Sequence, residues 1–203
     1  MMQGKRHAAL LGLVAVLSIG NAKAKDAGLA MQVIGPASPP VGYVAFCRDV
    51  PSQCVPLGSP RAEGLTAERW QELEAANALG NFLISPRTDL DHHNSEEVWS
   101  LPEDYGDCED FVLWKRRWLV ERGWPTGALL ITVAVDERGD GHAVLVARTD
   151  RGDFVLDNQT SSIELWHRTP YHFVKRQSSS DPDRWVRVEH RVHQPVTAST
   201  VAD

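Results

Sequence analysis

Apolar residues recur at helical spacing between Thr66 and about Ile84. Thr66 is a suitable N-cap, and Pro86 marks the end of the pattern because proline cannot continue a helix. The residues that share one helical face are Trp70, Leu73, Asn77 and Gly80 or Asn81. This stretch predicts the first long helix.

A second helical pattern runs from Asp107 to Arg122. Gly123 is a typical C-terminal stop, and Pro125 blocks continuation of the helix. The residues on its shared face are Cys108, Phe111, Val112, Trp118 and Leu119. The pattern therefore places a cysteine at the start of a helix.

Apolar runs separated by turn-forming clusters follow the second helix. We expect strands at 129–135, 142–148 and 154–157, and two further strands at 171–175 and 184–188. The short turns between the first three favour an antiparallel meander. These elements predict an α+β fold with N-terminal helices packed on an antiparallel sheet, and residues 88–107 predict a long ordered loop.

The first 24 residues have the pattern of an export signal. A positive segment ends at His7, residues 8–19 are apolar, and Ala22 and Ala24 form a small-residue cleavage site. The alternative is an uncleaved anchor or a buried helix. After the signal we expect an extended arm at 25–45, one domain at 46–190 and a flexible tail at 191–203.

Composition narrows the functional classes. The chain has 203 residues, 42% of them hydrophobic, which suits one compact domain. Its formal net charge is -6, and no block of cations interrupts the sequence. Nucleic acid is excluded as a partner because neutralising phosphates needs clustered lysine and arginine.

Export gives the three cysteines an oxidising context in which disulfides persist. Cys47 and Cys54 flank a short loop that contains Pro51, and we pair them. The alternative, half of a zinc site, lacks a compact second pair of ligands. Cys108 is left as a free thiol, either a buried small residue or a nucleophile.

The residues with the greatest catalytic potential lie around Cys108. A helix N-terminus lowers the pKa of a thiol, whereas the neighbouring Asp107, Glu109 and Asp110 oppose thiolate formation. An imidazolium would offset these acids, and His142 begins an expected strand. Asp157 ends the next strand, so Cys108, His142 and Asp157 have the order of a nucleophile, a base and an orienting acid. Taken alone, a histidine in a turn is usually just exposed, and an Asp-Asn pair after a strand usually belongs to a turn.

Several linked blocks together resemble the bacterial transglutaminase-like cysteine peptidases, the LapG-like periplasmic proteases. The blocks are YGDCEDF at 105–111, KRR at 115–117, GWP at 123–125, LITV at 130–133, GHAVL at 141–145, RGDFVLDN at 151–158 and FVKRQ at 173–177. The resemblance covers residues from about 46 to 186. It implies a papain-like, transglutaminase-like fold and a periplasmic hydrolase.

The resemblance also implies residue roles. Cys108 is the expected nucleophile, His142 the general base and acid, and Asp157 the carboxylate that orients the imidazole. The backbone N–H of Cys108 is one expected oxyanion donor, and Trp99 and Asn81 are candidates for the second.

For calcium, the resemblance implies a site at the acids beside the nucleophile, which are Asp107, Glu109 and Asp110 here. Helix capping is the alternative role for these acids. The implied partners are a large surface adhesin as substrate and an inner-membrane cyclic-di-GMP receptor that sequesters the protease. The fold-level alternatives are acyl transfer to an amine and a non-catalytic peptide-binding module.

A triad of this kind also constrains the strand register. We expect His142 and Asp157 to lie almost directly across from each other, with the hairpin turning within 148–151. Each residue of slip moves a strand by about 3.3 Å, so a larger slip would separate the two side chains.

Overall fold

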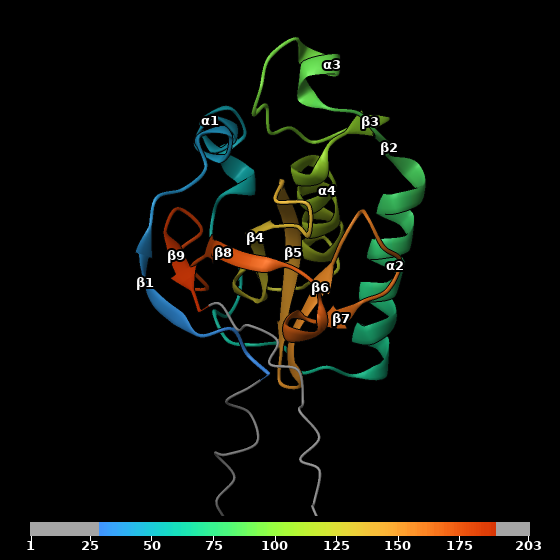
Figure 1. The fold of residues 1–203 in the computed structure, drawn as a ribbon. Helices are drawn as coiled ribbons and strands as arrows, with labels where there is room; N and C mark the ends of the chain where they lie inside the picture. Colours follow the sequence, from blue (N-terminus) through green and yellow to red (C-terminus); the bar gives the residue numbers. More distant parts are fainter. Residues whose placement is uncertain (1–28, 190–203) are drawn as a thin grey trace, which may run out of the picture.

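The structure is a computed structural model that describes residues 29–189 (Figure 1). The expected signal at 1–24 and the tail at 191–203 lie outside these residues, so their assignments stay predictions. Within residues 29–189, none of the helices combines the length and the apolar character needed to cross a bilayer.

One seven-stranded sheet forms the centre of the molecule, in the order β1-β9-β8-β4-β5-β6-β7. Every pairing in it is antiparallel, which confirms the expected α+β class. The strands are β1 (Val33–Ala37), β4 (Leu129–Val135), β5 (Gly141–Thr149), β6 (Gly152–Leu156), β7 (Glu164–Leu165), β8 (His172–Gln177) and β9 (Trp185–Val188). A separate parallel pair consists of β2 (Ser85–Pro86) and β3 (Tyr105–Gly106).

The helices lie mainly N-terminal to the sheet strands, as the sequence predicts. They are α1 (Val41–Asp49), α2 (Ala67–Leu83), α3 (Asp89–His93) and α4 (Cys108–Val120), with short 3-10 turns at Pro51–Gln53, Thr126–Ala128 and Trp166–Arg168. Thr66 caps α2 as expected, because its side chain accepts the backbone N–H of Arg69 at 3.2 Å. The expected loop at 88–107 contains α3 and β3.

Hydrophobic cores form on both faces of the sheet because alternate side chains of a strand point to opposite sides. In β5, Leu145 and Ala147 join the core beneath the helices, whereas Val144 and Val146 join a smaller core on the other face. Helix α4 lies against β5, and α2 lies beside α4 (Figure 1). This packing fixes the N-terminus of α4 at one end of β5.

The expected extended arm at 25–45 is wrong from Val41 onward, because α1 begins there. Residues 33–37 are extended and form β1 at the sheet edge. The cause of the helix is the apolar spacing of Tyr43 and Phe46, which both lie 3% exposed in the main core. Pro40 stands immediately before the helix, where a missing N–H costs nothing.

The structure contains the expected disulfide between Cys47 and Cys54, and Cys108 is free. The bridge joins the end of α1 to the 3-10 turn that follows it. Arg116 of α4 is buried beside this loop, and its guanidinium donates to the Gln53 carbonyl at 2.9 Å. The bridge and the arginine together hold α1 near α4.

Replacing both bridge cysteines, Cys47→Ala with Cys54→Ala, should lower the free energy of unfolding by about 2 kcal/mol, because the short closed loop gains entropy in the unfolded chain. Urea unfolding of the oxidised protein and the variant measures this. Equal free energies of unfolding would contradict stabilisation by the bridge. Alkylation of the unreduced wild-type protein should add one label, at Cys108.

Candidate active site

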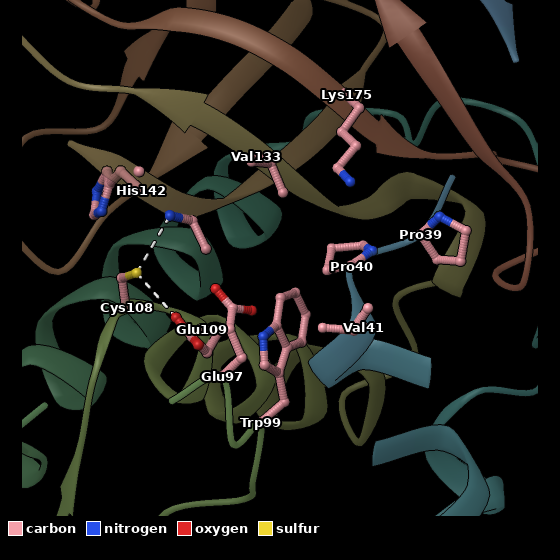
Figure 2. A pocket seen from close by; sticks show the side chains of 12 residues that line it. Pro39, Pro40, Val41, Glu97, Trp99, Cys108, Glu109, Val133, His142 and Lys175 are labelled. Atoms are coloured by element: carbon pink, nitrogen blue, oxygen red, sulfur yellow. Dashed lines mark hydrogen bonds between the residues drawn. The ribbon is translucent and has the colours of Figure 1, made fainter. Parts of the chain in front are cut away.

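Cys108 is the first residue of α4 and lies at the end of the sheet, half-buried (Figure 2). Its sulfur accepts a hydrogen bond from the backbone N–H of Ala143, the third residue of β5, at 3.3 Å. It also donates a hydrogen bond to Glu109 Oε2 at 3.1 Å. The packing of α4 on β5 therefore puts the thiol beside the start of the strand that carries His142.

His142 and Asp157 are in contact, and both are almost fully buried. His142 Nε2 lies 2.9 Å from Asp157 Oδ1, with side-chain exposures of 2% and 1%. An ionised carboxylate only accepts, so this contact places a proton on Nε2 and leaves Nδ1 as the basic nitrogen. The imidazole and the Cys108 sulfur lie at the same end of the pocket in Figure 2.

The observed register differs from the expected one by two residues. The hairpin turns at Asp150 and Arg151, inside the expected range, but β5 and β6 pair Leu145 with Leu156. Continuing this register places Asp157 across from Val144 rather than His142. Asp157 lies just past the end of β6, so its side chain reaches His142 diagonally.

Two further side chains surround this pair. The Tyr171 hydroxyl donates a short hydrogen bond to Asp157 Oδ2, and its ring lies 5.2 Å from the His142 ring. Gln159 Nε2 lies 3.5 Å from His142 Nδ1, and the Gln159 backbone N–H donates to Asp157 Oδ1 at 3.0 Å. Burial alone would raise the pKa of Asp157, but the bonds from His142, Gln159 and Tyr171 hold it below its ordinary value.

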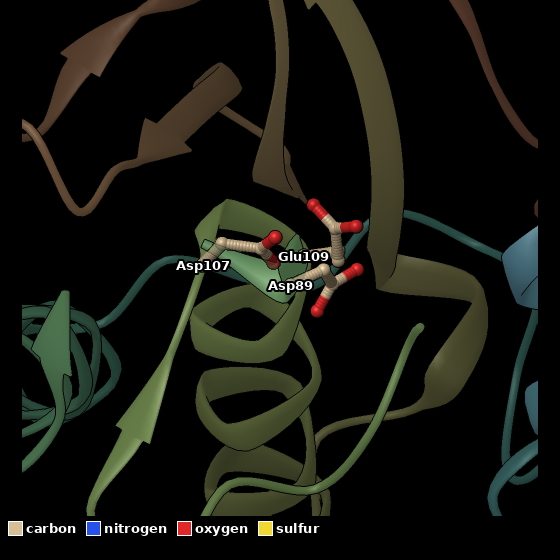
Figure 3. Close-up of side chains that lie close together, drawn as sticks. All are labelled: Asp89, Asp107 and Glu109. Carbon is tan, nitrogen blue, oxygen red and sulfur yellow. The ribbon is translucent and has the colours of Figure 1, made fainter. Parts of the chain in front are cut away.

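Three carboxylates meet at the first turn of α4 (Figure 3). Asp89, Asp107 and Glu109 each offer an oxygen, and these oxygens lie within 4.8 Å of one another. Asp107 Oδ1 is buried without a hydrogen-bond partner among the described residues. Three hard oxygen donors, one of them unsatisfied, suit a cation such as calcium.

Asp110 does not belong to this group, contrary to the expectation from the sequence. Its Oδ1 accepts the backbone N–H of Ser100 at 2.7 Å, so the carboxylate faces the loop before α4. The acid that completes the cluster is Asp89, which the sequence analysis did not select. Asp89 also accepts the backbone N–H of Val98 in a short hydrogen bond.

The electrostatics of the cluster oppose a thiolate. Burial, together with the adjacent charge of Glu109, raises the pKa of Cys108 well above its ordinary value. Burial and the charge of Asp107 raise the pKa of Glu109 to about 8. Asp107 and Glu109 therefore lie too close together for both to be ionised without a compensating positive charge.

Two hollows flank Cys108 and His142. One, of about 470 Å³, extends past Trp99 to Pro39, Pro40 and Val41 (Figure 2). The other, of about 490 Å³, also contacts Cys108 and His142 and extends to Arg87 and Asn158. A chain lying across both hollows would pass over the thiol.

The two candidates for the second oxyanion donor separate in the structure. Trp99 lines the first hollow, and its indole N–H is buried without a partner among residues 29–189. Asn81 instead donates to the backbone carbonyl of Asp157 at 2.9 Å, so it supports the loop. Trp99 is therefore the better candidate of the two.

The comparisons with known proteins agree with this arrangement. Residues 33–193 match the family described as bacterial transglutaminase-like cysteine proteinase. The chain belongs to this family. It is a cysteine peptidase, a hydrolase of the transglutaminase-like type.

Solved structures of Legionella pneumophila LapG are similar. The calcium-bound form is 27% identical, with a TM-score of 0.50 over 61% of this chain and 73% of that chain. Another LapG structure is 28% identical, with a TM-score of 0.47 over 54% and 64% of the two chains. The first match confirms the transglutaminase-like fold. No curated protein matches the sequence.

Sequence reasoning missed Asp89 and Tyr171. Asp89 follows Thr88, a suitable N-cap, so a short helix beginning there was the available signal. Tyr171 stood at the start of an expected strand, and its neighbour in space, Asp157, belongs to a different strand. Nothing in the spacing of either residue marks the contact that it makes.

Tyr171→Phe should lower kcat/KM about ten- to hundredfold, because it removes a hydrogen bond to the Asp157 carboxylate and retains the ring. Steady-state kinetics measures the change. Tyr43→Phe is the matched control, since it also deletes a hydrogen-bonded tyrosine hydroxyl, whose partners are the Pro182 carbonyl and the Gln177 side chain and not Asp157. An equal loss in both variants would contradict a specific role for Tyr171.

Proposed function

We propose that this protein is an exported, calcium-dependent cysteine endopeptidase that uses Cys108, His142 and Asp157. The observation that carries the proposal is the juxtaposition of a helix-initial thiol and a buried His–Asp pair, with His142 Nε2 2.9 Å from Asp157. Family membership supplies the reaction class. Two hollows that both border Cys108 and His142 leave room for a peptide beside the thiol.

The protonation of the site follows from its hydrogen bonds. Asp157 accepts from His142 Nε2, so Nδ1 takes the proton from Cys108 and later gives it to the leaving amine. The thiolate attacks the peptide carbonyl, and water then hydrolyses the thioester. Asp157 stays ionised throughout and stabilises the imidazolium.

Oxyanion stabilisation comes from donors near the thiol. The backbone N–H of Cys108 is at the start of α4, where the first N–H groups of a helix have no internal acceptor. The indole N–H of Trp99 is the second donor in this proposal. The position of the Trp99 side chain in the wall of the hollow beside Cys108, and the lack of a partner for its N–H among residues 29–189, support that role.

The proposed calcium ligands are Asp89, Asp107 and Glu109. When bound there, calcium supplies positive charge that offsets these carboxylates beside the nucleophile. Glu109 otherwise accepts a hydrogen bond from the Cys108 thiol, with Sγ 3.1 Å from Oε2, which favours the protonated form of the nucleophile. The calcium-bound state of the LapG structure agrees with this proposal.

We also propose the periplasm as the location and a large surface adhesin as the substrate class. The basic and apolar segments of residues 1–24 support export. The family resemblance supports an adhesin involved in biofilm attachment, and an inner-membrane cyclic-di-GMP receptor as the regulator. A protein substrate itself follows from the peptidase family.

Cleavage of a proteome-derived peptide library, followed by labelling of new N-termini, tests the triad. Wild-type protein with calcium should generate new termini, and Cys108→Ala and His142→Ala should generate none. Asp157→Asn should retain a small residual rate because Asp157 orients and does not attack. Cleavage by Cys108→Ala at the wild-type rate would end the proposal, and incorporation of a labelled amine in place of cleavage would favour acyl transfer.

Asp89→Asn should weaken calcium binding at least about tenfold, because it replaces a charged ligand by a neutral one of the same shape. Isothermal titration with calcium chloride measures the affinity. Asp91→Asn is the matched control, since Asp91 is an exposed acid of the same short helix and lies outside the cluster. Equal affinities in the two variants would contradict the site. Cleavage that a chelator does not affect would contradict calcium dependence and leave the triad standing.

A further inference from the structure

The buried face of α2 carries two amides directly behind the Asp157 loop. Asn77 is 1% exposed, and its Oδ1 accepts the backbone N–H of Asp157 at 3.0 Å. Asn81, one helical turn further on, donates to the Asp157 carbonyl at 2.9 Å. Both backbone polar groups of Asp157 are therefore held by side chains of α2.

Lys115 of α4 contacts the same amide from the other side. Its ammonium group is buried and donates to Asn77 Oδ1 at 2.8 Å. Gly80 provides the space, because a Cβ there would lie 2.9 Å from Lys115 Cε. Burial lowers the pKa of Lys115 to about 7, and the charge of Asp157 partly opposes this change. A buried lysine with an amide partner is costly and calls for a reason.

The donor and acceptor pattern supplies that reason. An amide side chain has two nearly isosteric orientations, but an ammonium group can only donate. Lys115 therefore forces the Asn77 oxygen toward itself, and this is also the orientation that accepts the Asp157 N–H. The Asn77 nitrogen then faces the carbonyls of Thr160 and Ser161, at 3.2 and 3.3 Å. In the opposite orientation the Asn77 nitrogen would face two donors, and the Asn77 oxygen would face two carbonyl oxygens. All four hydrogen bonds would then be lost.

We propose that Asn77 and Lys115 are positioning residues of the triad: the lysine fixes the orientation of the Asn77 amide, and this amide fixes the backbone of Asp157 so that its carboxylate meets His142. The inference rests on the proposed function, because it assigns these residues to Asp157 as the orienting acid. Neither residue touches Cys108 or the hollows. Their effect on the thiol passes through Asp157.

A double-mutant cycle on thiol reactivity tests the proposal without knowledge of the substrate. The measured quantity is the rate of Cys108 alkylation by iodoacetamide between pH 5 and 9, with calcium present. Lys115→Met and Asn77→Ala should each slow alkylation near neutral pH about ten- to hundredfold, because a displaced Asp157 no longer stabilises the imidazolium that pairs with the thiolate. In the Asp157→Ala background, the same substitutions should have no further effect.

Gln177→Leu is the matched control. Gln177 is also a buried amide whose oxygen accepts a backbone N–H, that of Ile131 at 3.0 Å, and it lies outside the triad. This variant should lose stability and keep the wild-type alkylation profile. If Asn77→Ala does not fold, Lys115→Met carries the test, since a buried methionine replaces a desolvated charge.

Three results would overturn the inference. One is a wild-type alkylation profile in folded Lys115→Met protein. Another is an equal slowing by Lys115→Met with and without Asp157, which indicates a general structural effect. The third is an Asp157→Ala variant that itself alkylates at the wild-type rate, which would reject the triad and this inference together. A loss of peptide cleavage alone, with the cycle behaving as expected, would reject only the peptidase proposal.

Discussion

The contact between the first turn of α4 and the start of β5 determines the rest of the site. Cys108 accepts the backbone N–H of Ala143, so the position of the thiol is fixed relative to β5, in which His142 directly precedes Ala143. A thiol on a flexible loop would lose conformational entropy each time it took up a reactive position. Here the ordering is done by the hydrophobic core, because Leu145 and Ala147 bury the same strand against the helices.

The second half of the site depends on a hairpin of minimal length. The turn at Asp150 and Arg151 fixes the register of β5 and β6, and with it the position at which Asp157 leaves the sheet. His142 and Asp157 both lie at the same sheet end as the helix N-terminus. The fold therefore gathers a thiol, an imidazole and a carboxylate from three elements with few degrees of freedom left to any of them.

The sequence predicts the regular elements well, and for physical reasons. Thr66 and Pro86 bound α2, and β4 spans the expected 129–135, because caps and apolar periodicity are local signals. Helix α1 was not predicted because Pro39 and Pro40 stand directly before it. It packs against Trp99, which is distant in the sequence. The diagonal placement of Asp157 relative to His142 was not predicted either, because the spacing of residues does not show how far a side chain extends between strands.

The site shows the same division between local and distant contacts. Cys108 and its neighbouring acids lie together in the sequence, whereas Asp89 reaches them only after the intervening segment closes back on α4. Asp89 also holds the backbone of Val98, the residue before Trp99. A cation at Asp89 would therefore share its carboxylate with the segment that carries Trp99, a wall of the hollow beside the thiol. Any ligand that moved this segment would also change how tightly the cation is held, because binding at the two positions would be coupled through one side chain.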